Sequence, residues 1–245
     1  MAFGFASRFD FFDSGEQFQL SRLRAQAQLD QWLVSTAGSK LAETGTNGAP
    51  GFWQRLRRAL AIRFDKSPIA SLDTLAEFVR TRSAYIAQTA LYGYLKTRMG
   101  TQYPKIFQDD QFTPSIDLSK SVVFIACLAD LTIFAAALTA RETAMTRDQS
   151  MALARACFAE ALSRTAAESR LKADLTAARA GFAERCEAVN WGATAIGEAA
   201  FTQSPEALIE SAPIADELKQ YDTEIVTNSI RFRWRDVRDQ LRKRL

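Results

Sequence analysis

Histidine, the side chain used most often in acid–base catalysis, is absent from this sequence of 245 residues. Its absence excludes Ser-His-Asp and Cys-His nucleophilic sites, histidine-ligated metals and the carboxylate–histidine di-iron sites of helical bundles. The sequence also contains no phosphate-binding glycine loop, no GxGxxG or GxSxG motif and no CxxC pair. We therefore expect no catalytic residue, no bound metal and no cofactor.

One carboxylate, that of Asp130, lies near the middle of the most apolar stretch of the chain, SVVFIACLADLTIFAAALTA over residues 121–140. A buried charge is costly unless it is paired or protonated. We expect Asp130 to bind a polar side chain of a neighbouring helix, with Arg82, Tyr85 and Tyr92 as the candidates. Alternatively, these four residues line a ligand pocket, because buried acids with perturbed pKa values concentrate at functional sites.

Two adjacent aspartates, Asp109 and Asp110, lie in a long connection predicted over residues 100–117. Aspartate pairs hold magnesium in all-helical isoprenoid synthases through a DDxxD motif. The run here reads DDQFT, so the third acid is missing, and no second acidic motif follows. We therefore assign no metal site to this pair.

The three cysteines, Cys127, Cys157 and Cys186, are odd in number and lack the spacing of a metal site. We expect them to lie on apolar helix faces, away from any cation that would activate a thiol. This pattern is typical of reduced thiols in a cytosolic protein. We expect all three to be buried and unreactive.

The C-terminal residues 213–245 combine an apolar stripe with many basic residues, and we predict one helix there. The stripe has spacings of 4, 4, 3, 4 and 4 residues, which is one helical face, and consists of Val226, Ile230, Trp234, Val237, Leu241 and Leu245. Residues 228–245 contain seven Lys or Arg and two Asp. We predict that this helix contacts an acidic protein partner through Arg231, Arg233, Trp234, Arg235, Arg238 and Arg242.

Other ligands also fit a basic helix with a tryptophan on its apolar face. Anionic lipid is the first alternative, because basic residues opposite Trp and Leu are typical of helices at a membrane surface. Nucleic acid is less favoured, because no known binding motif accompanies the arginines and the net charge of +3 is small. The location expected from these features is the cytoplasm, with attachment to the inner face of the membrane as the alternative.

These residues must be positioned by helices, and the pattern of the whole chain predicts an all-α fold. Apolar residues surround the helical circle over 121–140, which indicates a central helix, predicted over 118–144, that is buried on all sides. Twenty residues also span about 30 Å, the thickness of a hydrocarbon core. A central aspartate costs about 3 kcal/mol there and offsets most of the gain from insertion. We therefore favour the core of a soluble bundle.

We predict a single domain over 1–245, a bundle of roughly seven to nine helices. Its N-terminal arm, 1–13, is rich in aromatic residues, and a glycine-rich loop follows at 38–51. Further predicted features are a helix from Ser67-Pro68 to Met99, a capping box at Thr146 and Gln149, a break within the alanine-rich region at 166–169, and a short helix over 193–202.

The function expected from these features is that of a non-catalytic helical interaction or assembly protein. The alternatives are a peripheral protein that binds anionic lipid, and an all-α enzyme or small-molecule carrier with a pocket near Asp130. A cluster of convergent acids or an activated nucleophile would favour the enzyme, and the sequence shows neither.

Overall fold

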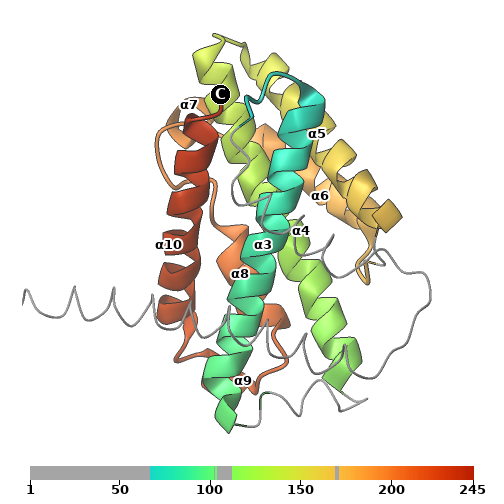
Figure 1. Ribbon diagram of the computed structural model, residues 1–245, viewed down its shortest axis with the longest axis vertical. Helices are drawn as coiled ribbons and strands as arrows, with labels where there is room; N and C mark the ends of the chain where they lie inside the picture. The colour runs from blue at the N-terminus through green and yellow to red at the C-terminus, as the bar shows by residue number, and fades with distance from the viewer. Residues whose placement is uncertain (1–66, 102, 104–111, 169–170) are drawn as a thin grey trace, which may run out of the picture. The chain divides into compact units, whose positions relative to one another are not determined.

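The computed structural model describes residues 67–245 except 102, 104–111 and 169–170, and these residues belong to one compact unit, 62–245. The elements α3 to α10 are all α-helices, and no strand occurs among the described residues (Figure 1). The predicted all-α fold is therefore confirmed. The predicted arm 1–13, the loop 38–51 and the pair Asp109-Asp110 lie outside the described residues, so the single domain over 1–245 stays a prediction.

The central helix is α4 (Phe112–Glu142), which contacts α3 (Leu72–Met99) and most of the helices that follow it. It begins at Phe112, within the connection predicted over 100–117, and not at 118. Pro114 lies in its first turn. A helix tolerates proline there because the N–H groups of the first turn have no intrahelical acceptor, so proline loses no hydrogen bond. The prolines at 104 and 114 led to the prediction of a connection up to residue 117, whereas α4 already begins at Phe112.

By length and composition alone, α4 could cross a membrane. However, 78% of its most apolar window of 18 residues is buried inside the protein, as expected for a core helix. The helices of soluble cores pass the same compositional test, so this feature assigns no membrane location.

Six further helices follow α4 in the described part of the chain. Their bounds are α5 (Arg147–Glu168), α6 (Leu175–Ala188), α7 (Trp191–Thr194), α8 (Gln203–Ser211), α9 (Asp216–Lys219) and α10 (Thr223–Arg242). Helix α5 packs against α3 and α4, α6 packs against α5, and α10 packs against α8 and α3. In Figure 1, α10 therefore lies on one side of α3 and the α5–α6 pair on the other.

Two of the predicted helix starts can be compared with the structure. The capping box before α5 is confirmed, because the Gln149 N–H donates to Thr146 Oγ1 at 3.3 Å and the Thr146 N–H donates to Gln149 Oε1 at 2.9 Å. The start of α3 at Ser67 is wrong. Ser71 caps this helix, with its Oγ accepting the Thr74 N–H at 3.2 Å, while the preceding Ile69 N–H donates to the Arg244 carbonyl at 2.8 Å.

The predicted break in the alanine-rich region is confirmed, because α5 ends at Glu168 and α6 begins at Leu175. The short helix predicted over 193–202 is wrong, since α7 ends at Thr194 and turns connect it to α8.

The single helix predicted from Pro213 is also wrong, because α9 and α10 are separated. Asp222 explains that separation. Its buried carboxylate accepts hydrogen bonds from Tyr94 Oη at 2.8 Å and Arg98 Nε at 2.5 Å, which draws the turn into the protein.

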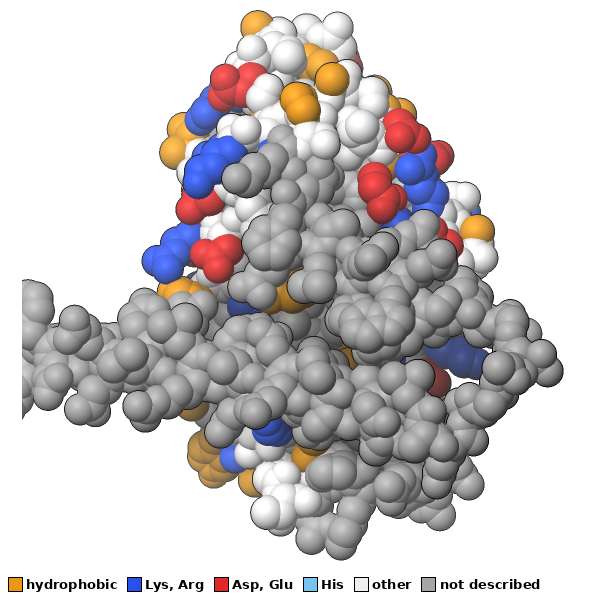
Figure 2. Space-filling view, in the orientation of Figure 1, with side chains coloured by type: hydrophobic (Ala, Val, Ile, Leu, Met, Phe, Trp, Pro, Cys, Tyr) orange, Lys and Arg blue, Asp and Glu red, His pale blue; other side chains and the backbone are white. Residues whose placement is uncertain are grey.

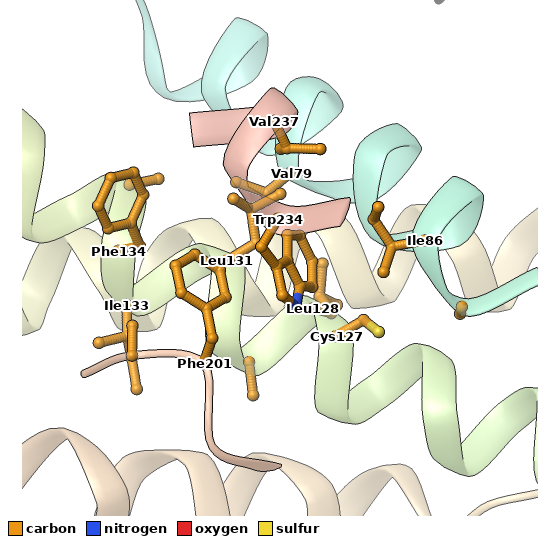
Figure 3. Close-up of a cluster of buried hydrophobic side chains, with 14 of the residues drawn as sticks. Val79, Ile86, Cys127, Leu128, Leu131, Ile133, Phe134, Phe201, Trp234 and Val237 are labelled. Carbon is orange, nitrogen blue, oxygen red and sulfur yellow. The ribbon is translucent and has the colours of Figure 1, made fainter. Parts of the chain in front are cut away.

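Part of the core is formed by buried side chains of α4, α10 and the segment before α8 (Figure 3). The rings of Phe201 and Trp234 have centroids 4.8 Å apart, and those of Phe201 and Phe134 are 5.5 Å apart. Five of the six stripe residues predicted for α10 are buried, and only Leu245 is exposed. The predicted buried face of this helix is therefore confirmed.

Charged side chains on the surface are mostly intermixed. Arg80 of α3 donates to Glu168 of α5 at 2.8 Å, and Arg164 of α5 forms ion pairs with Asp73 and Glu160. Figure 2 shows basic and acidic side chains next to one another on the described part of the face turned to the viewer. The pairs of Arg80 with Glu168 and of Arg164 with Asp73 join α3 and α5, which also pack against each other in the core.

Candidate functional site

Asp130 is fully buried and binds the start of another helix. Its Oδ2 accepts the Ser204 N–H at 2.8 Å, and its Oδ1 accepts the Gln203 N–H at 3.3 Å. These are the first N–H groups of α8, whose N-cap residue, Thr202, makes no side-chain capping bond. Because the first N–H groups of a helix lack intrahelical acceptors, Asp130 of α4 supplies the cap that α8 does not supply itself.

Arg185 of α6 completes this arrangement. One of its terminal nitrogens lies 2.8 Å from Asp130 Oδ1 and also donates to the Ala200 carbonyl at 2.7 Å. The other donates to Gln203 Oε1 at 2.7 Å. Trp234 of α10 joins the network by donating its indole N–H to Ser204 Oγ at 3.0 Å. One buried network thus connects α4, α6, α8 and α10.

Burial raises the pKa of Asp130, and the opposing influences of Arg185 and Ser204 only reduce that rise. Burial also raises the pKa of the Cys127 thiol well above its usual range, with the nearby Asp130 charge as a smaller cause. Both carboxylate oxygens of Asp130 are engaged in hydrogen bonds. The geometry therefore suits a structural role, since an acid–base catalyst must reach a substrate.

The predicted partners of Asp130 were wrong. Arg82 is buried and donates its Nε–H to Gln240 Oε1 at 2.8 Å, while Tyr85 is exposed. Tyr92 lies beneath the Lys120 ammonium, 5.8 Å from its ring centroid. The four residues proposed to line one pocket therefore do not meet. A signal for Arg185 did exist, because it lies between the apolar stripe residues Phe182 and Cys186 and so on the inward side of α6.

Two surface pockets of the described region are formed by other residues. One, of about 430 Å³, is lined by Phe112, Ser115, Ala212, Pro213, Ile214 and Lys219. The other, of about 290 Å³, is lined by Leu138, Arg141, Glu142, Arg242 and Leu245. Asp130 lines neither of them, so neither supports the alternative of a carrier or enzyme with a pocket near this residue.

All three cysteines are buried and none forms a disulfide, as the sequence predicted. Burial raises the pKa of Cys157 to about 12 and that of Cys186 to about 11. The thiolate is the reactive form, so these thiols are poor nucleophiles near neutral pH. Among the described residues, no group of three or more Cys, Asp or Glu side chains is placed to hold a metal ion.

The six residues predicted to bind a partner divide between the two sides of α10. Arg231, Arg235 and Arg242 are exposed, and Arg233 is half-buried. Trp234 and Arg238 are buried, so their assignment to a partner surface was wrong. Trp234 belongs to the apolar stripe itself.

Arg238 is directed to the inner side of α10 by two acceptors. It donates to Glu198 Oε1 at 2.5 Å and to the Gly197 carbonyl at 3.2 Å, and its guanidinium lies 5.6 Å from the Phe201 ring centroid. It follows Trp234 by one helical turn and therefore lies beside the buried stripe. Its role is to hold the segment between α7 and α8 against α10.

Arg231 and Arg235 are exposed on the outer face of α10, and Arg235 stacks on the Phe232 ring at 4.4 Å. Arg242 lies on the side toward α4, with its guanidinium 5.7 Å from the Phe134 ring centroid, and pairs with Asp239 at 3.1 Å. Neither Arg231 nor Arg235 forms an ion pair with any residue in the described part of the chain. Asp236 is exposed on the same helix, so this face carries both signs of charge with arginine in excess.

Comparison of this chain with known protein families, curated proteins and solved structures finds no similar protein. The outer face of α10 is therefore the candidate functional site on the geometry alone.

Proposed function

We propose that this protein is a non-catalytic helical interaction or assembly protein. Its contact with an acidic protein partner is made by the exposed arginines of α10, namely Arg231 and Arg235 on the outer face and Arg242 near the C-terminal end. One observation carries this proposal. Two exposed arginines, Arg231 and Arg235, lie one turn apart without an acidic partner among the described residues, on a helix whose opposite face is fixed in the core.

The fixed inner face makes the arginines a well-positioned surface. Because Ile230, Trp234 and Val237 are buried, α10 cannot rotate about its axis without opening the core. Stacking on Phe232 also orders Arg235, which lowers the entropy lost when it binds. A partner would thus meet guanidinium groups that already have a defined spacing.

The chemistry of these groups suits carboxylates. Two like charges at positions i and i+4 destabilise a helix by about 0.2–0.5 kcal/mol, and an acidic partner would reverse the sign of that interaction. Guanidinium groups bind carboxylates through two parallel hydrogen bonds, which gives direction as well as affinity. We therefore expect one or more Asp or Glu side chains of the partner between Arg231 and Arg235.

The mixed charge of the face favours protein over anionic lipid. Asp236 and Asp239 are exposed on α10 near these arginines and would be repelled by a uniformly negative membrane surface. A protein partner can place its own charges to match both signs. Three buried thiols suit the reducing cytoplasm, where we place this interaction.

The proposal is tested with the Arg231→Glu/Arg235→Glu double variant, which leaves the buried Arg238 intact. Since both side chains are exposed, we expect the free energy of unfolding to change by no more than about 0.5 kcal/mol for each substitution. Crosslinking and co-purification from the native cell should lose the partner captured by the wild type. Capture should also weaken with salt, because exposed charges are screened over about 8 Å at physiological ionic strength.

The matched control is Lys172→Glu/Arg179→Glu, which changes the net charge equally at exposed positions away from α10. It should keep the partner. If the α10 variant recovers every wild-type partner, the arginines are only a solvated face. Flotation with anionic but not neutral vesicles would instead favour the membrane alternative.

A further inference from the structure

A second surface, distinct from the arginines, lies at the α9–α10 turn. Leu218, Tyr221 and Ile225 have exposed fractions of 44%, 74% and 71%. Single exposed apolar residues are normal on a protein surface, but three within eight residues are a patch of the kind that marks an interaction site. These three residues are called the α9–α10 patch below.

The three residues are brought close together by a tight turn over residues 220–222, which connects α9 to α10. The Tyr221 N–H donates to the Leu218 carbonyl at 3.2 Å, and the Val226 N–H donates to the Asp222 carbonyl at 2.8 Å. Gln220 and Asp222 both have right-handed helical dihedral angles. Leu218, Tyr221 and Ile225 are therefore exposed at the end of α9, in the turn and in the first turn of α10, respectively.

The patch is held in place from below by Asp222. Its buried carboxylate is bound by Tyr94 and Arg98 of α3, while the residue next to it, Tyr221, is exposed. Ile225 follows in the first turn of α10, whose inner face is fixed by Val226. The exposure of the patch is thus imposed by the fold, and its side chains do not simply project from a loose loop.

The exposed charges in the part of the chain that carries the patch are almost all negative. Over residues 203–225, five acids are exposed, namely Glu206, Glu210, Asp216, Glu217 and Glu224. The only basic residue in that stretch is Lys219, and its ammonium is paired with Asp216 at 2.9 Å. On α3, the guanidinium of Arg98 is engaged by Asp222, and Lys96 is exposed in the last turn.

We propose that the α9–α10 patch docks a basic amphipathic segment of a partner protein. Its apolar side chains would cover Leu218, Tyr221 and Ile225, while its Lys or Arg residues would pair with Glu217 and Glu224. The pocket of about 430 Å³ beside Lys219, which Ile214 and Phe112 also line, offers space for one apolar anchor. Anionic lipid does not fit, because the exposed acids would repel it.

This proposal does not depend on the arginine surface. The acids lie before and at the start of α10, whereas Arg231, Arg235 and Arg242 lie further along it. The two surfaces therefore call for segments of opposite charge. Loss of one would leave the other in place, so the two proposals fail separately.

The test measures peptide binding to the full chain by fluorescence anisotropy. The probe is a labelled peptide with leucines at positions i, i+3, i+4 and i+7 and lysines elsewhere. Two further peptides carry glutamates in place of the lysines, or the same lysines and leucines in scrambled order. We expect the lysine peptide to bind, the glutamate peptide not to bind, and the scrambled peptide to bind at least tenfold more weakly.

Variants of the protein locate the site. Tyr221→Ser/Ile225→Ser and Glu217→Lys/Glu224→Lys should each weaken binding of the lysine peptide at least tenfold. The matched controls are Ile196→Ser, which removes an isoleucine with an exposed fraction of 69% at another place, and Asp148→Lys/Glu184→Lys. Both controls should bind as the wild type does. Equal binding of the scrambled peptide, or wild-type binding by either patch variant, would overturn the proposal.

Discussion

Asp130 takes the place that a capping side chain normally holds at a helix N-terminus, although it belongs to a different helix. A buried carboxylate next to a single arginine is often taken as the mark of an active site. Here both of its oxygens accept backbone N–H groups of α8, and the arginine also binds the Ala200 carbonyl. The same physical chemistry that tunes a catalytic acid thus serves to join four helices.

The protonation of Asp130 gives a prediction at the scale of one residue. Its pKa is raised above the ordinary 3.8, so the folded state binds its proton more tightly than the unfolded state. Its contribution to stability is therefore complete below about pH 3.8 and is lost as the pH rises through the folded-state pKa. We expect the free energy of unfolding of the wild type, minus that of Asp130→Asn, to fall as the pH rises above the ordinary pKa of 3.8 and through the raised folded-state pKa.

Urea titrations at several pH values measure that difference. The other carboxylates titrate in both proteins and cancel, so the difference isolates this position. A difference that stays constant, or rises with pH, would show that ionised Asp130 is favoured by the folded state.

The sequence could not identify the partner of Asp130. Periodicity predicts which side of a helix is buried but not which helix lies opposite, and Arg185 is 55 positions away along the chain, as the numbering shows. The candidates Arg82, Tyr85 and Tyr92 were chosen from a helix that does contact α4, but at other positions. Burial of a carboxylate was predictable, and the choice among possible cations was not.

At the scale of an element, α10 shows how an apolar stripe and an excess of arginine combine. The stripe spacing predicted the buried residues correctly because every fourth or third residue returns to one face. It could not show that Arg238, at the edge of the stripe, is drawn inwards by Glu198 and the Gly197 carbonyl. It also could not show the separation of α9 from α10, because that depends on Tyr94 and Arg98 of α3.

Two arginines of α10 should respond differently to the same substitution. Arg238→Glu places a carboxylate beside Glu198 on the inner side, and we expect a loss of about 2–3 kcal/mol of stability. Arg235→Glu changes an exposed position and should cost no more than about 0.5 kcal/mol. Thermal and urea denaturation of both variants measure the contrast. Equal stability of the two would mean that Arg238 leaves its site at little cost.

For the whole molecule, the central question is what surrounds α4. Its composition fits either a lipid bilayer or a protein core, and the sequence favoured the core mainly because Asp130 offsets most of the free energy gained by insertion. In the structure, the side chains of α3, α5 and α8 provide that surrounding. The fold class was thus predictable from periodicity. The arrangement of the helices was not, because it arises from contacts between residues far apart in sequence.

Detergent phase partitioning tests this view of the whole molecule. We expect the wild type to remain in the aqueous phase, because the apolar surface of α4 is already covered by protein. The Asp130→Leu variant is the informative control, since it lowers the cost of inserting α4 into a bilayer by about 3 kcal/mol. If α4 is a core helix, this variant also stays aqueous. Recovery of the wild type in the detergent phase would contradict the core assignment.

The cap that Asp130 provides has a consequence for how the chain acquires its shape during synthesis. Helix α8 has nine residues, too few to persist in water by itself, and its first N–H groups are satisfied by a residue 74 positions earlier. A ribosome releases α4 before α8, so the acceptor is already outside the exit tunnel when its donors emerge. The order of synthesis therefore makes the capping carboxylate of Asp130 available before α8 forms.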